Sequence, residues 1–144
     1  MSVQQPDGPD LGSVLGMGDH DVRLRLGDPV SDRLVAGVRW LVYAADGWRL
    51  RLRLSGAPRS DCRVRSLTLD LDDGGRSLEE LLGRLGLETA GPIEPVPRSE
   101  GRMLRCEVAA RSGPASLTAR VSGGSIRSVT VFDEPPDWTG EARA

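Results

Sequence analysis

The chain has 144 residues and a formal net charge of −2 at neutral pH. This length suits a single domain that buries about two-thirds of the surface of its unfolded chain. The near-neutral total argues against a dedicated nucleic-acid-binding protein, because such proteins are usually basic overall. No apolar run approaches the ~20 residues that span a bilayer, so we expect no membrane partner.

The composition points to a bacterium with a high-GC genome. The chain contains no Lys, so all 19 of its basic residues are Arg, which GC-rich codons favour. Acidic and basic residues are separated along the chain: residues 21–66 carry ten Arg and five Asp, whereas residues 67–101 carry eight acidic residues and three Arg. This asymmetry bears on partners and association rather than on the fold.

Residues 1–20 are expected to form a flexible acidic N-terminal segment, because they combine Pro, Gly and Asp with few apolar side chains. They lack the basic and apolar regions of a secretory signal. We therefore expect a cytoplasmic protein in which the two cysteines, Cys62 and Cys106, are reduced core residues.

The first predicted strand covers residues 22–26, where apolar residues alternate strictly with Arg. Gly27 and Pro29 then interrupt the pattern. A stronger signal follows at Asp46-Gly47, which lies between two β-prone runs. This pair favours a two-residue hairpin turn, because both central residues of such a turn need positive φ. We therefore expect a hairpin over residues 38–54.

The position of this turn fixes the register of the two strands. It sets Tyr43 opposite Leu50 and Trp40 opposite Arg53, and directly opposed residues share a face of the sheet. One face then belongs to the core and carries Leu41, Tyr43, Leu50, Leu52 and Leu54. The other face carries Arg49, Arg51 and Arg53 beside Trp40, Val42 and Ala44.

Residues 62–71 form the next predicted strand, and their alternation slips near Arg65, which predicts a β-bulge there. The clearest helix follows at residues 78–85. Ser77 and Glu80 match a capping box, and the leucines of the segment fall on one stripe. The glycine directly after it suits the left-handed position that ends a helix.

The C-terminal part is expected to contain a loop, one further strand and a second hairpin. Residues 88–101 hold three Pro and two Gly, which predicts the loop. Residues 103–110 alternate and predict a strand, and residues 116–132 predict the hairpin. Residues 133–144 form an expected acidic tail.

The turn of the second hairpin can be argued from its charges. A two-residue turn would place Arg120 opposite Arg127, a like-charge pair that destabilises a sheet. We therefore expect a three-residue turn with Gly124 in the left-handed region. The expected register sets Leu117 opposite Val129 and Val121 opposite Ser125.

These elements predict the α+β class. We expect an antiparallel β-meander of about seven strands in a curved sheet or half-barrel, with one amphipathic helix inserted after the fourth strand. A single domain would cover residues 21–132. One helix covers only part of such a sheet, so the remainder must curl, meet another subunit or face water.

The candidate binding residues are the aromatic and basic side chains of one sheet face and of the tail: Trp40, Arg49, Arg51, Arg53 and Trp138. Guanidinium groups bind carboxylate or phosphate, and Trp can stack on a cation or a ligand ring. The alternative is an ordinary solvated face whose Arg stems cover Trp40.

The residues give little support to catalysis. The only His, His20, lies in the acidic N-terminal segment, and no nucleophile–base pair can be named. The stretch that begins at Asp70 resembles a calcium loop, but the position that should be Glu is Leu81. We therefore expect no metal and no cofactor, and we lean against an enzyme.

Three functions follow from this surface. The first is a non-catalytic protein-interaction module of a regulatory, chaperone-like or immunity type, binding another protein or a second copy of the chain. The second, which we favour less, is binding of a nucleic acid or a phosphorylated ligand on the same face. The third is a small ligand-binding or enzymatic domain with a pocket between sheet and helix.

Overall fold

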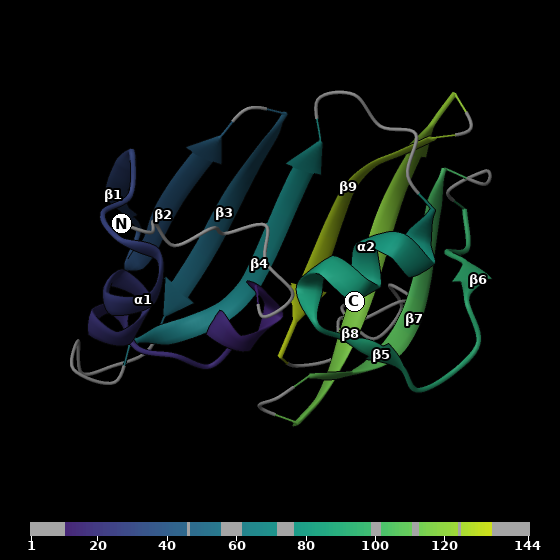
Figure 1. The fold of residues 1–144 in the computed structure, drawn as a ribbon, viewed down its shortest axis with the longest axis horizontal. Helices are drawn as coiled ribbons and strands as arrows, with labels where there is room; N and C mark the ends of the chain where they lie inside the picture. Colours follow the sequence, from purple (N-terminus) through teal and green to yellow (C-terminus); the bar gives the residue numbers. More distant parts are fainter. Residues whose placement is uncertain are drawn as a thin grey trace.

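The computed structural model shows one open antiparallel sheet with its helices on a single face (Figure 1). It describes residues 11–45, 47–55, 62–71, 77–98, 102–110, 113–123 and 125–133. The expected α+β class and antiparallel sheet are confirmed. Within the described residues the sheet has nine strands rather than about seven, and it does not close into a barrel. None of the described helices is long and apolar enough to cross a membrane.

In chain order the elements are the 3-10 helix η1 (Leu11–Val14), α1 (Asp19–Leu26), β1 (Ser31–Val35), β2 (Val38–Ala45), β3 (Trp48–Ser55), β4 (Arg63–Leu71), α2 (Leu78–Leu85), β5 (Glu88–Thr89), β6 (Glu94–Pro95), β7 (Met103–Ala110), β8 (Gly113–Ser122) and β9 (Ser125–Phe132). The strand order across the sheet is β1-β2-β3-β4-β9-β8-β7-β5, and β6 also pairs with β7.

The N-terminal part differs from expectation. Residues 22–26 form most of α1 rather than a strand, and the first strand is β1. The helix is favoured because acidic residues occupy its first turn and arginines its last, as the helix dipole prefers. Gly27, at φ 85°, ends it with an N–H···O bond to Arg23. Within the segment expected to be flexible, Val14 and Leu15 are buried.

The β2–β3 hairpin has the predicted register. Tyr43 lies opposite Leu50 and Trp40 opposite Arg53. Gly47 has φ 88°, in the region that favours glycine, while Asp46 lies outside the described residues. The face predicted for the core is buried, with Leu41, Leu50, Leu52 and Leu54 each at 0 % exposure.

The helix α2 and the bulge in β4 are also confirmed. The Ser77 hydroxyl accepts the N–H of Glu80, and Gly86 is left-handed after the last turn. β3 pairs Arg53 with Ser66 but Leu54 with Val64, so Arg65 is the extra residue of β4. The segment expected to be a loop over 88–101 contains the two short strands β5 and β6.

The predicted turn of the last hairpin is wrong. Leu117 does not face Val129; the observed register pairs Leu117 with Val131, Arg120 with Ser128, Val121 with Ile126 and Ser122 with Ser125. The turn therefore has two residues, and Gly124 lies outside the described part of the chain. The like-charge pair that argued against this turn does not arise, because Arg127 is a bulge residue and Ser128 takes its place opposite Arg120.

The core lies between the sheet and the three helices. Alternate residues of every long strand point to this side, and the largest of the fully buried side chains are leucines, which include Leu41, Leu50, Leu52, Leu54, Leu67, Leu81, Leu85 and Leu117. Both α-helices lie on this face in Figure 1. No described element covers the opposite face of the sheet.

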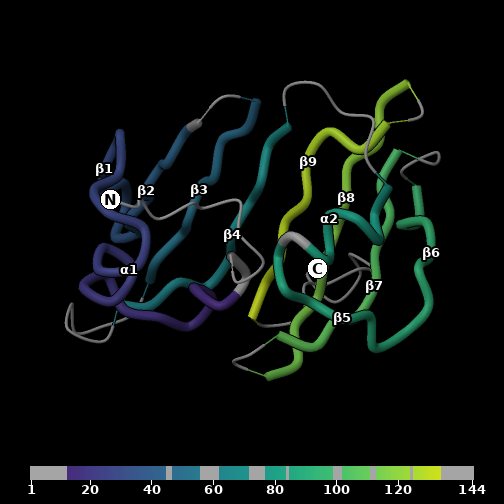
Figure 2. The backbone as a smooth tube through the Cα atoms, in the orientation of Figure 1, coloured from purple at the N-terminus to yellow at the C-terminus, as the bar shows by residue number. Residues whose placement is uncertain are grey.

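The fold consists of two similar halves. Each half begins with a helix and continues with antiparallel strands, and the last strands of the halves, β4 and β9, pair at the centre of the sheet (Figure 2). Both of these strands carry a bulge at an arginine, Arg65 and Arg127. At the centre, Thr68 lies opposite Thr130, 62 residues further along the chain.

The sequence supports this internal duplication. Residues 64–69 read Val-Arg-Ser-Leu-Thr-Leu, and residues 126–131 read Ile-Arg-Ser-Val-Thr-Val. Arg, Ser and Thr are identical, and every other position holds a branched aliphatic residue. The match keeps the same register as the two bulges, so an approximate two-fold axis passes between Thr68 and Thr130.

Leu67 tests the importance of the central strand pair, because it is fully buried on β4 opposite Val131. We expect Leu67→Ala to lower the free energy of unfolding by about 3 kcal/mol, through lost burial and the cavity left behind. The same change at Leu34, which is 67 % exposed on β1, should cost less than about 0.5 kcal/mol. Urea denaturation followed by circular dichroism measures both; equal losses would contradict this placement of the core.

Candidate functional site: the uncovered face of the sheet

The uncovered face of the sheet, meaning the side opposite the helices, is built from three rows of side chains that cross the strands. The rows run from β2 through β3, β4, β9 and β8 to β7. They are Ala44–Arg49–Asp70–Ser128–Arg120–Met103, Val42–Arg51–Thr68–Thr130–Thr118–Arg105 and Trp40–Arg53–Ser66–Phe132–Ser116–Glu107. In the middle row two arginines flank three threonines, because alternate residues of each strand point to the same face.

Four of the five predicted binding residues share this face. Arg49, Arg51 and Arg53 line β3, and Trp40 lies beside Arg53 in the register. Trp40 is half-buried, while Arg49 is exposed. Trp138 lies outside the described residues.

The arginines of β3 differ in their partners. Arg51 donates to both carboxylate oxygens of Asp70, from Nε at 2.9 Å and from Nη2 at 3.3 Å. Arg49 lies opposite the same Asp70 in the register. Arg49 and Arg53 make no ion pair with any residue that the structure describes. These two cations are available to an anionic ligand.

A shallow hollow of about 190 Å³ lies at the centre of the face. It is lined by Arg51, Thr68, Asp70, Met103, Thr118, Arg120, Ser128 and Thr130. The Thr68 and Thr130 hydroxyls are hydrogen-bonded at 3.0 Å. A wider depression of about 660 Å³ adjoins it at the end of β7 and β8, where Met103 and Arg120 again take part.

Sequence reasoning missed the residues of this hollow outside β3. Thr68, Ser128 and Thr130 are ordinary strand residues in isolation, and Arg120 was considered only as a member of a like-charge pair. The repeated Arg-Ser-x-Thr of residues 65–68 and 127–130 was the available signal. A repeat at this spacing places its two copies side by side when the last strands of the halves pair.

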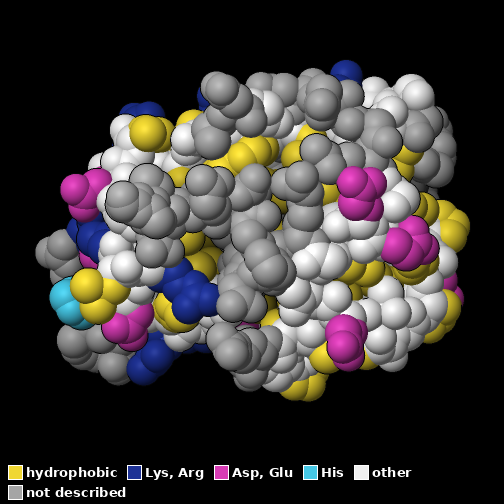
Figure 3. Space-filling model, in the orientation of Figure 1, with side chains coloured by type: hydrophobic (Ala, Val, Ile, Leu, Met, Phe, Trp, Pro, Cys, Tyr) yellow, Lys and Arg dark blue, Asp and Glu magenta, His cyan; other side chains and the backbone are white. Residues whose placement is uncertain are grey.

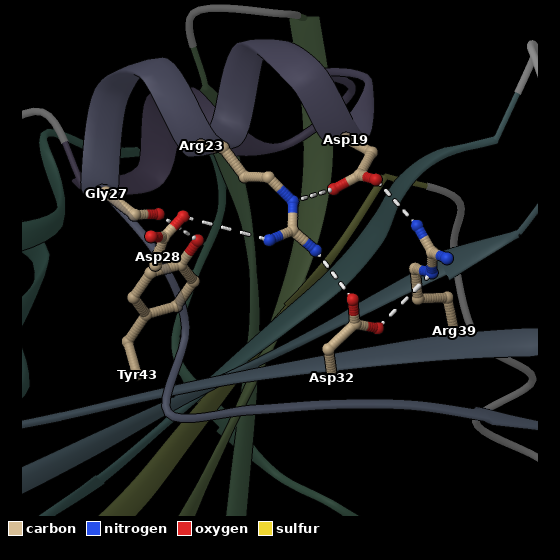
Figure 4. Close-up of polar contacts among 7 residues, drawn as sticks. All are labelled: Asp19, Arg23, Gly27, Asp28, Asp32, Arg39 and Tyr43. Carbon is tan, nitrogen blue, oxygen red and sulfur yellow. Dashed lines mark hydrogen bonds and ion pairs between the residues drawn. The ribbon is translucent and has the colours of Figure 1, made fainter.

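A second polar cluster lies on the helix-covered side, where α1 meets β1 and β2 (Figure 4). Asp19 contacts Arg23 Nε at 2.8 Å and Arg39 Nη1 at 2.6 Å. Asp32 contacts Arg23 Nη2 at 2.6 Å and Arg39 Nε at 3.4 Å. The four side chains form a closed ring of alternating charge in which each carboxylate oxygen has a partner. This ring fastens α1 to the sheet and leaves no carboxylate oxygen of Asp19 or Asp32 without a partner.

Tyr43 adds a neutral contact to the same region. Its hydroxyl donates to the carbonyl oxygen of Gly27 at 2.9 Å, at the end of α1. Burial raises the pKa of Tyr43 to about 12, because a phenolate at this position would lose its hydration. The Arg23 cation opposes this shift.

The helix-covered face differs from the uncovered face in its distribution of charged side chains. In Figure 3 acidic side chains lie over both halves of this face, whereas basic side chains lie mainly near α1. Glu79 and Glu80 in the first turn of α2 and Glu88 in β5 are exposed on the half that contains α2. The two faces of the sheet therefore present different surfaces to a partner.

Nucleophilic and metal chemistry find little support among the described residues. Cys106 is buried, and loss of hydration raises the pKa of its thiol. His20 is exposed on α1. The described residues contain no cluster of three or more metal-binding side chains. Asp70 is paired with Arg51, and the acidic residues that follow it lie outside the described ranges.

The comparisons with known proteins identify the fold alone. No protein family and no curated protein matches the sequence. A cysteine-rich secretory protein from Staphylococcus aureus subsp. aureus Mu50 has a similar structure, with a TM-score of 0.51, 10% identity and coverage of 93% of this chain and 51% of its own. An extracellular protein containing an SCP domain, from Bacillus anthracis str. Ames, gives 0.51, 12%, 96% and 49%. The chain thus spans about half the length of each.

Tyr43 is the only tyrosine, so its ionisation can be followed by ultraviolet absorbance of the phenolate. We expect a midpoint near the pKa of about 12 instead of the ordinary 10.0. Because the folded state holds the proton more tightly, this contribution to stability is complete below pH 10 and is lost as the pH rises through 12. Tyr43→Phe should remove this slope. A midpoint at 10.0 in the folded protein would contradict the buried contact with Gly27.

Proposed function

We propose that the chain is a non-catalytic protein-interaction module that binds its partner on the uncovered face of the sheet. The observation that supports this most is the difference between the two faces. One face is packed against the helices, whereas the other offers Arg49 and Arg53 without described ion-pair partners. An extended surface of this kind suits a macromolecule better than an enclosed small molecule.

The residue types favour a protein partner. Trp and Arg are enriched in interfaces and among the residues that contribute most to binding. Trp40 lies between Arg33 on β1 and Arg53 on β3 in the register, so an aromatic surface is flanked by two cations. Such a patch fits an acidic segment that also carries an apolar residue.

Two finer parts of the proposal concern self-association and location. The exposed acidic residues near α2, such as Glu79 and Glu88, offer charge opposite to that of the uncovered face, which supports contact between copies of the chain.

Cys62 and Cys106 are both free, which supports a cytoplasmic location because thiols persist in a reducing compartment.

Arg53→Glu tests the interaction surface, because Arg53 lies in the middle of the patch and loses no described ion pair. We expect proteins retained from a native cell extract by the wild-type chain to be lost by this variant, and retention to weaken as salt rises. Quantitative mass spectrometry of the bound fraction measures the change, which should be at least about tenfold for a central interface residue.

Arg98→Glu is the matched control, because it changes the charge equally at an exposed position between β6 and β7. It should retain the same proteins as the wild type. If Arg53→Glu and Arg98→Glu retain the same set, the uncovered face is not the interaction surface. If short single-stranded oligonucleotides bind the wild type at low salt and Arg53→Glu abolishes this, the partner is a nucleic acid instead.

A further inference from the structure

We infer that the hollow at the centre of the uncovered face is an oxyanion site that takes one carboxylate group of the partner protein. This inference rests on the proposed function, because it names the chemical group that the interaction module recognises. Arg51 and Arg120 provide the charge for the site, and the hydroxyl groups of β4, β9 and β8 provide the remaining donors.

Side-chain length creates the hollow. Around the hollow the three central strands place four short hydroxyl residues, namely Thr68, Thr118, Ser128 and Thr130. The strands on either side place arginines, with Arg51 on β3 and Arg105 on β7. Long side chains around short ones leave a depression over Thr68 and Thr130. The backbone below is paired in the sheet, so only side chains are available to a ligand.

The hollow carries an excess of positive charge. Its titratable residues are Arg51, Arg120 and Asp70. Asp70 occupies the Nε and Nη2 atoms of Arg51, which fixes this guanidinium and leaves Nη1 as a donor. Arg120 is exposed and makes no ion pair with a described residue. One arginine is therefore held in place and a second is free to close on a ligand.

The hydroxyl groups add further hydrogen-bond donors to those of the arginines. Only one hydrogen is shared between the oxygens of Thr68 and Thr130, so the second hydroxyl of the pair still has a hydrogen to donate. Thr118 and Ser128 line the hollow as well. A site with this many donors and a single, already paired carboxylate is complementary to an anionic oxygen acceptor.

The size of the hollow limits the ligand to one functional group. Its volume of about 190 Å³ lies below the range of roughly 300–1,000 Å³ found for cofactor and drug-sized ligands. A carboxylate fits the planar fork of an arginine. An Asp or Glu side chain, or a C-terminal carboxylate, of a protein lying along the uncovered face would reach it.

The duplication lets the two sides of the approximate two-fold axis be compared, and only one side has the hollow. Across the two-fold axis Arg53 corresponds to Arg120 and Ser66 to Ser128. The position equivalent to Asp70, however, is Phe132, which places a bulky apolar side chain beside Ser66. The two halves thus differ at this position, and the hollow lies on the side of the axis where Asp70 is opposite Ser128.

The test is an NMR titration of the folded chain at low salt with sodium acetate and, separately, with inorganic phosphate. We expect saturable shifts of amides around Thr118, Ser128 and Thr130 with acetate. Arg120→Gln should weaken acetate binding at least about tenfold, because it removes a charged hydrogen bond. Arg98→Gln should leave it unchanged. Thr130→Val, which removes one hydroxyl of the central pair, should weaken binding without loss of charge.

Four results would overturn the inference. Shifts that spread over all exposed arginines would indicate non-specific screening, and acetate binding unchanged in both Arg120→Gln and Thr130→Val would exclude the hollow. Phosphate binding that depends on Arg120, without acetate binding, would replace the carboxylate by a phosphate. If Arg53→Glu loses the partner proteins but no acetate site is found, this inference alone is overturned. If an acetate site is found but Arg53→Glu retains the partner proteins, only the proposed interaction surface is overturned.

Discussion

The pairing of β4 with β9 is the constraint on which both faces of the sheet depend. It is the strand pair that joins the two halves, and its register places Leu67 opposite Val131 on one side and Thr68 opposite Thr130 on the other. The buried aliphatic residues anchor the core below the helices, while the hydroxyls form the floor of the hollow. A slip of one residue would exchange the two sets, so packing free energy also holds the polar centre in place.

The helix-covered face and the uncovered face differ in how completely their charged side chains are paired. On the first, charges are neutralised internally: the ring of Asp19, Arg23, Asp32 and Arg39 satisfies each carboxylate oxygen and secures α1. On the second, Arg51 pairs with Asp70 and Arg105 with Glu94, whereas Arg49, Arg53 and Arg120 have no ion pair with a described residue. Complete internal pairing is typical of a structural role, whereas incomplete pairing on a rigid sheet leaves attraction for an external anion.

Local patterns predicted those parts of the fold whose signals lie within a few residues. The Asp-Gly turn, the capped helix at 78–85 and the bulge at Arg65 are of this kind. The strict alternation of residues 22–26 was misleading, because the dipole and the glycine after it favour a helix in an eight-residue segment whose one fully buried residue is Val22. The last turn was mispredicted because the prediction assumed repulsion between Arg120 and Arg127, and the bulge at Arg127 removes this contact. Residues of the hollow could not be found by local reasoning, since β4 and β9 meet across 62 positions.

The two outer edges of the sheet are unequal. Beyond β7 the pairing ends in strands of two residues, and β6 contains Pro95, which has no N–H to offer. β1 has five residues without proline, pairs with β2 on one side only within the described residues, and exposes Leu34 and Val35. Growth of the sheet through backbone pairing is therefore open in one direction. Two copies that paired through β1 would each use the longer of the two sheet edges that the structure describes, and such a two-fold contact closes after two copies.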